Sequence, residues 1–334
     1  MIAVLLINLG TPQSAEVPAV RAFLKEFLDD SHVIALPRVI RKLLLHFFIL
    51  PFRPKQSAKA YAAIWDEEKG SPLLTHSMNL AKDLQQQLGQ DYLVTLGMRY
   101  QKPSIQAALE VILQSDCKKL IVLPLFPQYS NAANGSAIDK LKECLKPVSQ
   151  LPELRIFREF YQIPAYIAAQ ASLIKSSLTH QDGILFSYHS LPVSHIKKTA
   201  SHCAAHCFAN QPCNAIKLTN QKCYRAQCYE TSRLLAEYLD LQHYEVAFQS
   251  RLGRTVWIGP DVKTTMQKMR AQGIKNLLVA CPSFVADCLE TLEEIGIQGK
   301  RQWQALGGEE FTLVPCMNAD PVWVKAAAEM IQSA

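Results

Sequence analysis

The sequence GILFSYHSLP, from Gly183 to Pro192, begins with an apolar run and ends in polar residues. Its start, Ile184–Phe186, is typical of a strand buried in a parallel sheet, and Pro192 prevents that strand from continuing. Ligands of open α/β sheets bind outside the carboxyl ends of the strands, so His189 is placed for chemistry. A hydrogen-bonded histidine that closes a turn is the alternative that this stretch alone leaves open.

Eight segments of the chain have the apolar character of buried strands, although one of them, Leu154–Phe157, is weaker. Helix-like patterns such as Thr231–Leu239 and Val262–Ala271 lie between most of these segments. This alternation of strands and helices predicts parallel sheets with helical crossovers. The other seven predicted strands are Ile2–Leu9, Tyr92–Gly97, Leu120–Leu125, Ile184–Tyr188, Tyr244–Phe248, Leu277–Cys281 and Phe311–Pro315.

The second half of the chain repeats the pattern of the first. Strands two to four recur after about 152 to 157 residues, and Lys119–Phe126 resembles Asn276–Phe284 in local sequence. We therefore predict two tandem, similar Rossmann-like α/β domains, over residues 1–160 and 161–316, each with a parallel four-stranded sheet flanked by helices. Their strand ends are expected to face a shared cleft, and a helix over 321–331 is expected to fold back onto the first domain. The sequence has no Gly-rich nucleotide loop and no H-E-x-x-H or G-x-S-x-G motif.

The composition is that of a globular protein with a mild positive charge. Of 334 residues, 49% are hydrophobic and 19% charged, and the net charge is +6. This excess fits an anionic ligand, an acidic lipid surface or an ordinary solvated surface, whereas no Lys/Arg run supports nucleic acid binding. Met1–Gly10 is predicted to be a strand and not a secretory signal, because it lacks a basic start and a cleavage site. No apolar stretch reaches the ~18–20 residues that cross a bilayer, so we expect a cytoplasmic chain with reduced cysteines.

One segment, 33–55, departs from the alternation of strands and helices. It contains the apolar decamer Leu43–Phe52, with Lys and Arg residues on both flanks. The decamer is too short to span a membrane, but a basic-flanked apolar helix can lie in a membrane interface or line a hydrophobic pocket. A core helix capped by cations is the alternative. We interpret the segment as the lip of a ligand pocket.

Acidic residues gather directly after the seventh predicted strand, in ADCLETLEE from Ala286 to Glu294. On a helix, Glu290 and Glu294 lie one turn apart on the same face. A structural alternative is that Asp287 caps the helix and Glu290 completes a capping box. Two aligned carboxylates at a strand end instead offer a path for a metal ion or for protons.

Several motifs, in order along nearly the whole chain, resemble those of ferrochelatases. The sequence around His189 closely resembles the family's active-site histidine motif, and the run that contains Glu290 is similar to the family's acidic motif. Further similarity lies in Asn8–Pro12, Gly70–Pro72, Gly97–Tyr100, Pro127–Ser130 and Phe248–Trp257. The resemblance implies the chelatase fold and a lyase of haem biosynthesis, which inserts ferrous iron into protoporphyrin IX to form protohaem and releases two protons.

The resemblance also implies roles for individual residues. We expect His189 to abstract protons, to contact the Fe²⁺ substrate, or both, because neutral imidazole is a base near neutral pH and a borderline metal ligand. Glu290 is expected to face it as a second metal contact, and Glu294 to continue a carboxylate path. The implied porphyrin-binding residues are Arg53, Tyr61, Ser71, Arg99 and Tyr129.

Half of the ten cysteines lie within residues 201–229. Such density in a reducing compartment indicates metal ligation, by iron–sulfur or by zinc. Similar enzymes without a cluster often share Cys228, and some bacterial ferrochelatases carry a cluster on an internal cysteine segment. The resemblance therefore implies a [2Fe–2S] cluster here, while two nearby histidines, His202 and His206, keep zinc open and free surface thiols are the third possibility. The four implied cluster ligands are Cys203, Cys207, Cys213 and Cys223.

The implied partners are protoporphyrin IX and Fe²⁺, without nucleic acid. Peripheral contact with a membrane surface or with the preceding enzyme of the haem pathway is a further expectation. Two alternative functions stay open. One is a chelatase for coproporphyrin III or sirohydrochlorin, and the other is a non-catalytic haem or iron–sulfur carrier or sensor that uses the cysteine segment.

Overall fold

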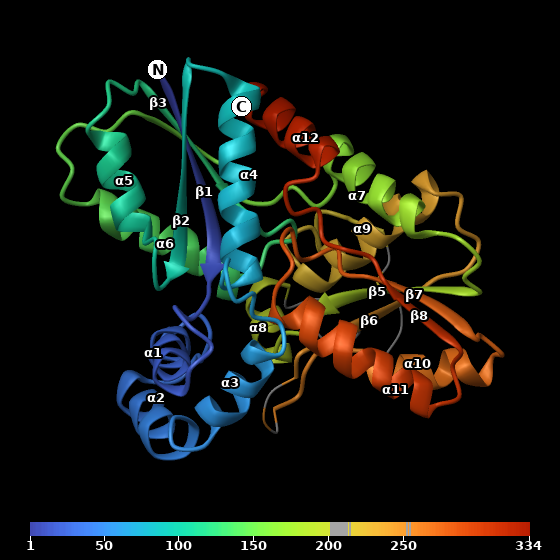
Figure 1. Cartoon of the computed structure of the whole chain (residues 1–334). Coiled ribbons are helices and arrows are strands. Elements are labelled where there is room, and N and C mark those ends of the chain that lie inside the picture. The colour runs from blue at the N-terminus through green and yellow to red at the C-terminus, as the bar shows by residue number, and fades with distance from the viewer. Residues whose placement is uncertain (201–212, 214, 252, 254) are drawn as a thin grey trace. The chain divides into compact units, whose positions relative to one another are not determined.

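The computed structural model describes residues 1–200, 213, 215–251, 253 and 255–334 (Figure 1). Contacts between Cα atoms divide the chain into two compact units. Unit 1 comprises Met1–Phe126, Ser130–Glu159 and Asn318–Ala334, and unit 2 comprises Pro127–Tyr129 and Phe160–Met317.

Unit 1 is built on a parallel sheet with the strand order β2-β1-β3-β4. Its strands are β1 (Ile2–Gly10), β2 (Tyr92–Tyr100), β3 (Lys119–Pro124) and β4 (Glu153–Ile156). Its helices are α1 (Val17–Leu28), α2 (Arg38–Leu44), η1 (Leu45–Ile49), α3 (Arg53–Ala62), α4 (Pro72–Leu88), α5 (Ile105–Leu113), η2 (Asn131–Gly135), α6 (Ser136–Leu145) and α12 (Pro321–Gln332). The C-terminal helix α12 packs against α4, so both ends of the chain belong to unit 1.

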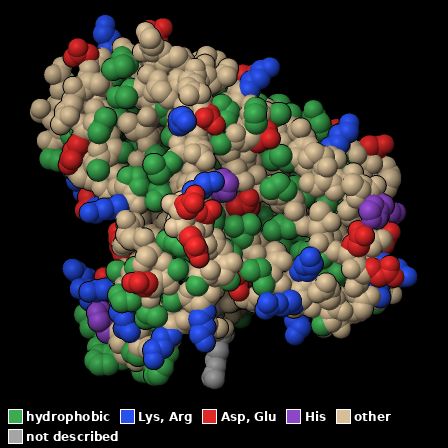
Figure 2. Space-filling model, viewed as in Figure 1, with side chains coloured by type: hydrophobic (Ala, Val, Ile, Leu, Met, Phe, Trp, Pro, Cys, Tyr) green, Lys and Arg blue, Asp and Glu red, His purple; other side chains and the backbone are tan. Residues whose placement is uncertain are grey.

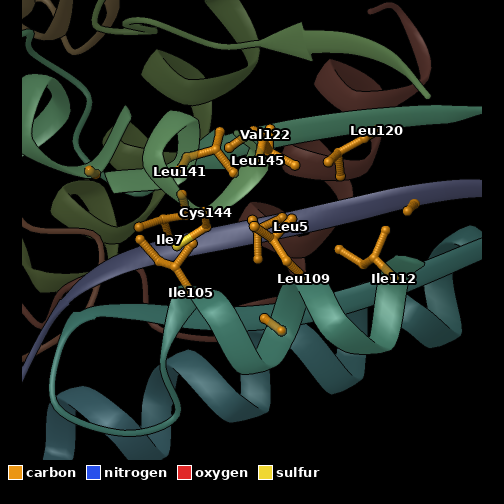
Figure 3. Packing of buried hydrophobic residues seen from close by; sticks show 13 residues of the cluster. Leu5, Ile7, Ile105, Leu109, Ile112, Leu120, Val122, Leu141, Cys144 and Leu145 are labelled. Carbon is orange, nitrogen blue, oxygen red and sulfur yellow. The ribbon is translucent and has the colours of Figure 1, made fainter. Parts of the chain in front are cut away.

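The core of unit 1 explains why β1 reads as a continuous apolar run. Leu5 and Ile7 pack against α5 and α6 on one face of the sheet (Figure 3). Val4 and Leu6 point to the opposite face and are also fully buried, and α4 contacts both β1 and β2. A strand covered on both faces needs apolar residues at every position, which is the pattern of parallel sheets.

Unit 2 has a second parallel sheet, with the strand order β6-β5-β7-β8. Its strands are β5 (Gly183–His189), β6 (Glu245–Gln249), β7 (Asn276–Ala280) and β8 (Glu310–Leu313). Its described helices are α7 (Pro164–Ser177), α8 (Val193–Thr199), α9 (Tyr224–Tyr238), α10 (Val262–Ala271), η5 (Leu289–Gly299) and α11 (Lys300–Ala305). Leu185 at the centre of this sheet belongs to a core cluster with Met266 of α10 and Trp303 of α11.

The two units repeat each other in strand order and in local detail. In unit 1, Met98 N of β2 donates to the carbonyl of Pro103, in the loop that follows the strand, at 2.6 Å. In unit 2, Phe248 N of β6 donates to the carbonyl of Pro260 in the same way, at 2.8 Å. A π-helix follows the third strand in each unit, η2 after β3 and η5 after β7. The prediction of two similar α/β domains with parallel four-stranded sheets is therefore confirmed.

The segment 33–55 forms α2, the π-helix η1 and the start of α3, and it carries an exposed apolar surface. Phe47, Phe48 and Phe52 are 66%, 70% and 74% exposed. Hydrophobic side chains gather with Lys and Arg side chains over these helices, at the lower left of Figure 2. The alternative of a buried core helix is therefore wrong for this segment. Among the described residues, no helix is long and apolar enough to cross a membrane.

Candidate active site

His189 is the last residue of β5, and hydrogen bonds fix its backbone and its ring. The His189 Nδ1 atom lies 2.5 Å from the carbonyl oxygen of Ser190. The Tyr224 hydroxyl donates to the backbone carbonyl of His189 at 2.9 Å. A carbonyl can only accept, so the proton of the neutral ring is assigned to Nδ1 and the lone pair to Nε2. The half-buried imidazole therefore presents a proton acceptor or metal ligand at the end of the strand.

The acidic run after β7 leads into the π-helix η5. This helix is not capped by Asp287 and Glu290, which was the structural alternative for this run. Cys288 is the N-cap residue and Thr291 completes the capping box, so Asp287 and Glu290 do not have those roles. Asp287 is buried instead, where Oδ1 accepts from the Thr291 hydroxyl (3.1 Å) and from Cys316 N (3.3 Å). The Glu290 side chain is half-buried, and it interacts with the Cys288 thiol at the start of the helix.

The pKa of Glu294 depends on burial and on several neighbouring residues of the site. Burial raises the pKa of its carboxyl above the ordinary value. Hydrogen bonds from Ser250, and the positive charge that the His189 ring carries once it is protonated, act in the opposite direction, while the charge of Glu290 acts with burial. His189 pairs with Gln249 across β5 and β6, and Gln249 donates to the Glu290 carbonyl and lies 3.5 Å from Glu294 Oε2, so the three predicted catalytic residues lie around one residue of unit 2.

Gln249 and Ser250, at the end of β6, bond to the acidic helix η5. Neither residue was predicted from the sequence to belong to the site. Ser250 donates to Glu294 from its backbone N–H (2.7 Å) and its hydroxyl (2.5 Å). Gln249 donates to the backbone carbonyl of Glu290 at 2.7 Å, and its own carbonyl accepts from the Ser187 hydroxyl at 2.6 Å. The only available signal was their place at a strand end in a family-like motif, because their partners are more than 40 residues away.

Four of the predicted porphyrin-binding residues lie in unit 1. Tyr61 is buried with its ring edge-on to Phe23, and the buried Ser71 hydroxyl bonds to the Thr11 hydroxyl at 2.8 Å. Arg53, at the start of α3, is half-buried, and burial lowers the pKa of its guanidinium. Among the described acidic side chains, none forms an ion pair with Arg53, so its charge is available to an anionic ligand.

Arg99 is held by a buried carboxylate of unit 1. Its Nη2 donates to Asp30 Oδ2 at 2.6 Å, and its Nε donates to the Ser136 hydroxyl at 2.7 Å. Its side chain is only 16% exposed. The direct partners of Arg99 are therefore protein groups.

Tyr129 and the cysteine segment belong to unit 2 where they are described. Tyr129 is half-buried, and its backbone N–H donates to Gln227 at 2.6 Å. Cys223 is the buried N-cap residue of α9, and Cys213 is half-buried. The other two predicted ligands, Cys203 and Cys207, and the two histidines of the zinc alternative lie outside the described residues. Within the described part of the chain, no three His, Cys, Asp or Glu side chains are grouped as a metal site.

Comparison with known proteins places this arrangement in one family. The ferrochelatase family model matches residues 1–334. Ferrochelatase of Legionella pneumophila (strain Lens) is 52% identical over 329 residues, covering 98% of this chain and 97% of the relative. Ferrochelatase of Coxiella burnetii (strain CbuK_Q154) is 49% identical over 333 residues, covering 98% and 92%.

A solved structure with the same fold is SirB from Bacillus subtilis with Fe³⁺. It has a TM-score of 0.54, with 10% identity over 99% of this chain and 94% of that protein. At this identity the likeness concerns the fold alone, and it agrees with the predicted chelatase fold. The match of the family model over the whole length and the two close relatives show that this chain belongs to the ferrochelatase family.

Proposed function

We propose that this chain is a lyase that inserts Fe²⁺ into protoporphyrin IX, forming protohaem and releasing the two pyrrole protons. Membership of the ferrochelatase family supports this reaction. The observation that carries the proposal is the acceptor atom of His189, since its ring is tied through Nδ1 to Ser190 and so leaves Nε2 without a proton. His189 pairs with Gln249 in the sheet, and Gln249 contacts both Glu290 and Glu294.

His189 is assigned to the first proton transfer. A free-base porphyrin holds two N–H protons, and both must leave as the metal enters. Neutral imidazole accepts a proton near neutral pH, and the bond from Nδ1–H to the Ser190 carbonyl becomes stronger once the ring is charged. The same Nε2 atom is a ligand for Fe²⁺, so His189 serves the proton, the metal, or both in turn.

Glu290 and Glu294 are assigned to the metal and to the departing protons. Carboxylates bind a divalent ion that has lost part of its water, and Glu290 is the second contact for the Fe²⁺ substrate. Glu294 is ionised less readily than an exposed glutamate, because burial raises the pKa of its carboxyl. A carboxylate with a raised pKa is a better proton acceptor, so Glu294 suits the onward transfer of a proton.

Arg53, Tyr61, Ser71, Arg99 and Tyr129 are assigned to porphyrin binding by the family resemblance. Arg53 has the strongest support, since its half-buried guanidinium forms no ion pair with the described acidic residues and suits a propionate. The contacts of Ser71 and Arg99 with protein groups favour an indirect contribution, through the shape of unit 1.

We further propose a [2Fe–2S] cluster on Cys203, Cys207, Cys213 and Cys223, which would supply a one-electron redox centre. Cys213 and Cys223 fit this assignment, because the pKa of Cys228, raised mainly by burial, is raised further by both sulfurs. The three sulfurs therefore share one neighbourhood around the start of α9. In addition, Arg225 donates from Nη1 to Cys213 Sγ at 2.8 Å, and a cationic donor favours a thiolate ligand.

The exposed apolar surface of α2 and η1 is proposed to rest on an anionic membrane surface. Val39, Phe47 and Phe48 are 70%, 66% and 70% exposed, and basic residues flank them in sequence. Apolar side chains with a basic rim bind an anionic membrane interface. Contact with the preceding enzyme of the haem pathway is the alternative for this surface.

The test of the reaction is an anaerobic assay of the purified protein with ferrous iron and one tetrapyrrole at a time. We expect the absorption spectrum of a metalloporphyrin to appear with protoporphyrin IX, at a rate above the protein-free control. Faster turnover of coproporphyrin III or sirohydrochlorin would assign the chain to a different chelatase reaction. No product from any of the three would favour the non-catalytic carrier or sensor.

A further inference from the structure

Ser250, the residue after β6, has an unusual backbone conformation. Its φ angle is +66°, in the left-handed region that residues other than glycine rarely adopt. Such a conformation is unfavourable, and it persists only where the surrounding structure imposes it. Strained residues of this kind cluster at functional sites, so the contacts of Ser250 indicate what its conformation serves.

The left-handed turn directs two donors of one residue onto one carboxylate. The backbone N–H of Ser250 reaches Glu294 Oε1 at 2.7 Å, and the hydroxyl reaches Oε2 at 2.5 Å. With a donor on each oxygen, the plane of the carboxylate is fixed. An unheld glutamate on a helix would instead rotate about its side-chain bonds.

The neighbouring residue makes this arrangement rigid. Gln249 is buried, and its amide nitrogen donates to the Glu290 carbonyl and lies 3.5 Å from Glu294 Oε2. The amide oxygen of Gln249 is held by the Ser187 hydroxyl of β5. Ser250 therefore follows a strand, β6, whose end is held in place, and it bonds to the helix η5, which Gln249 of β6 also contacts.

We propose that Ser250 is the positioning residue for Glu294: its N–H and hydroxyl hold that carboxylate in the orientation in which it takes up the proton or passes on the metal. This inference rests on the proposed function and deepens it, because it names the group that orients Glu294. In this role Ser250 acts through Glu294 and not on the reacting atoms.

Ser250→Gly is the most informative variant. Glycine keeps the left-handed turn and the backbone N–H and removes the CH2OH side chain, and with it the hydroxyl donor. We expect an equal or higher melting temperature, an unchanged KM for porphyrin, and a kcat lower by roughly 10- to 100-fold, as for the loss of a hydrogen bond to a charged group. Asp240→Gly is the matched control, since Asp240 is also left-handed (φ +52°) but exposed after α9, and its kcat is expected to equal that of the wild type.

A double-mutant cycle shows whether Ser250 acts through Glu294. On a Glu294→Gln background, Ser250→Gly is expected to cause little further loss of kcat, because the group that it orients is already gone. Wild-type kcat in the Ser250→Gly protein would overturn the inference. Losses that multiply in the double variant would also overturn it.

A readout that needs no turnover separates this inference from the reaction itself. In protein labelled with ¹³C at glutamate carboxyls, the Glu294 resonance is the one that disappears in Glu294→Gln. We expect Ser250→Gly to shift this resonance and Asp240→Gly to leave it in place. An unshifted resonance in Ser250→Gly would refute the positioning role even if the wild-type enzyme inserted iron, whereas a shifted resonance in a protein without turnover would count against the proposed function alone.

Discussion

Replacing Asp30 by Asn is expected to destabilise the protein in a way that depends on pH. Asp30 is buried, and burial by itself raises the pKa of its carboxyl. Hydrogen bonds from Ser136, the His32 backbone and Tyr100, together with the charge of Arg99, outweigh burial and lower this pKa from 3.8 to about 2. The network joins the segment after α1 to β2 and α6: Arg99 donates to Asp30 Oδ2 at 2.6 Å, and His32 Nδ1 lies 3.0 Å from Asp30 Oδ1.

The size of the effect follows from this shift. A difference of nearly two pKa units between the folded and unfolded chain corresponds to about 2 kcal/mol of stability. Because the folded pKa is the lower one, this contribution is fully present above about pH 5 and is lost as the pH falls toward 2. Asp30→Asn removes it and leaves Arg99 without its carboxylate, so at pH 7 we expect a loss of about 2 kcal/mol or more and a melting temperature lower by roughly 4–8 °C.

Thermal melts of the wild type and Asp30→Asn between pH 7 and pH 3 measure this prediction. The gap between the two melting temperatures is expected to be constant above pH 5 and to narrow below pH 4. Asp29→Asn is the matched control, because the Asp29–Arg41 pair has a carboxylate that is 37% exposed and is expected to contribute about 1 kcal/mol or less. A gap absent at pH 7, or equally large at pH 3, would refute the assignment of Arg99 to this buried network.

Three further predictions concern the proposed site and its surroundings. Glu294→Gln is expected to raise the melting temperature at pH 7, because the pKa of Glu294 is higher in the folded than in the unfolded chain, so its ionised form costs stability. This gain should vanish as the pH falls below the ordinary pKa of 4.5. A melting temperature at pH 7 below that of the wild type would contradict the direction of the pKa shift. The Phe47→Glu/Phe48→Glu double variant is expected to bind anionic vesicles at least about tenfold more weakly in flotation assays. Val111→Glu, at an exposed position on α5, should bind as the wild type does. Equal flotation of the wild type and both variants would contradict the membrane proposal. Anaerobically purified protein is expected to be brown and to lose this visible absorption in Cys223→Ser but not in Cys117→Ser; a colourless protein that contains zinc would replace the cluster by a zinc site.

The sequence was sufficient for the features that depend on local pattern. Continuous apolar runs are what a strand covered on both faces requires, and all eight predicted strands are present with ends shifted by a few residues. The position of His189 followed from the same logic, because a polar residue directly after a buried strand must lie at the end of the sheet.

Features that depend on long-range contacts or on backbone geometry were not predictable. Apart from His32, the partners of Asp30 are Arg99, Tyr100 and Ser136, which lie 69 to 106 positions away, and no periodicity marks them. The helix after β7 was expected to have Glu290 and Glu294 one turn apart, and its π-helical form was not foreseen because a π-helix has no sequence pattern of its own. The conformation of Ser250 gave no signal either, since serine is not a residue typical of left-handed turns.

The most direct test of the account is the rate of iron insertion by His189→Ala. The measurement is anaerobic metalloporphyrin formation from Fe²⁺ and protoporphyrin IX, with His180→Ala as the control, since His180 is an exposed histidine paired with Glu310. We predict a fall in kcat of roughly 10²- to 10⁴-fold for His189→Ala and for Glu290→Gln, with unchanged melting temperatures and a normal rate for His180→Ala. A folded His189→Ala protein that inserts iron at nearly the wild-type rate would contradict the account.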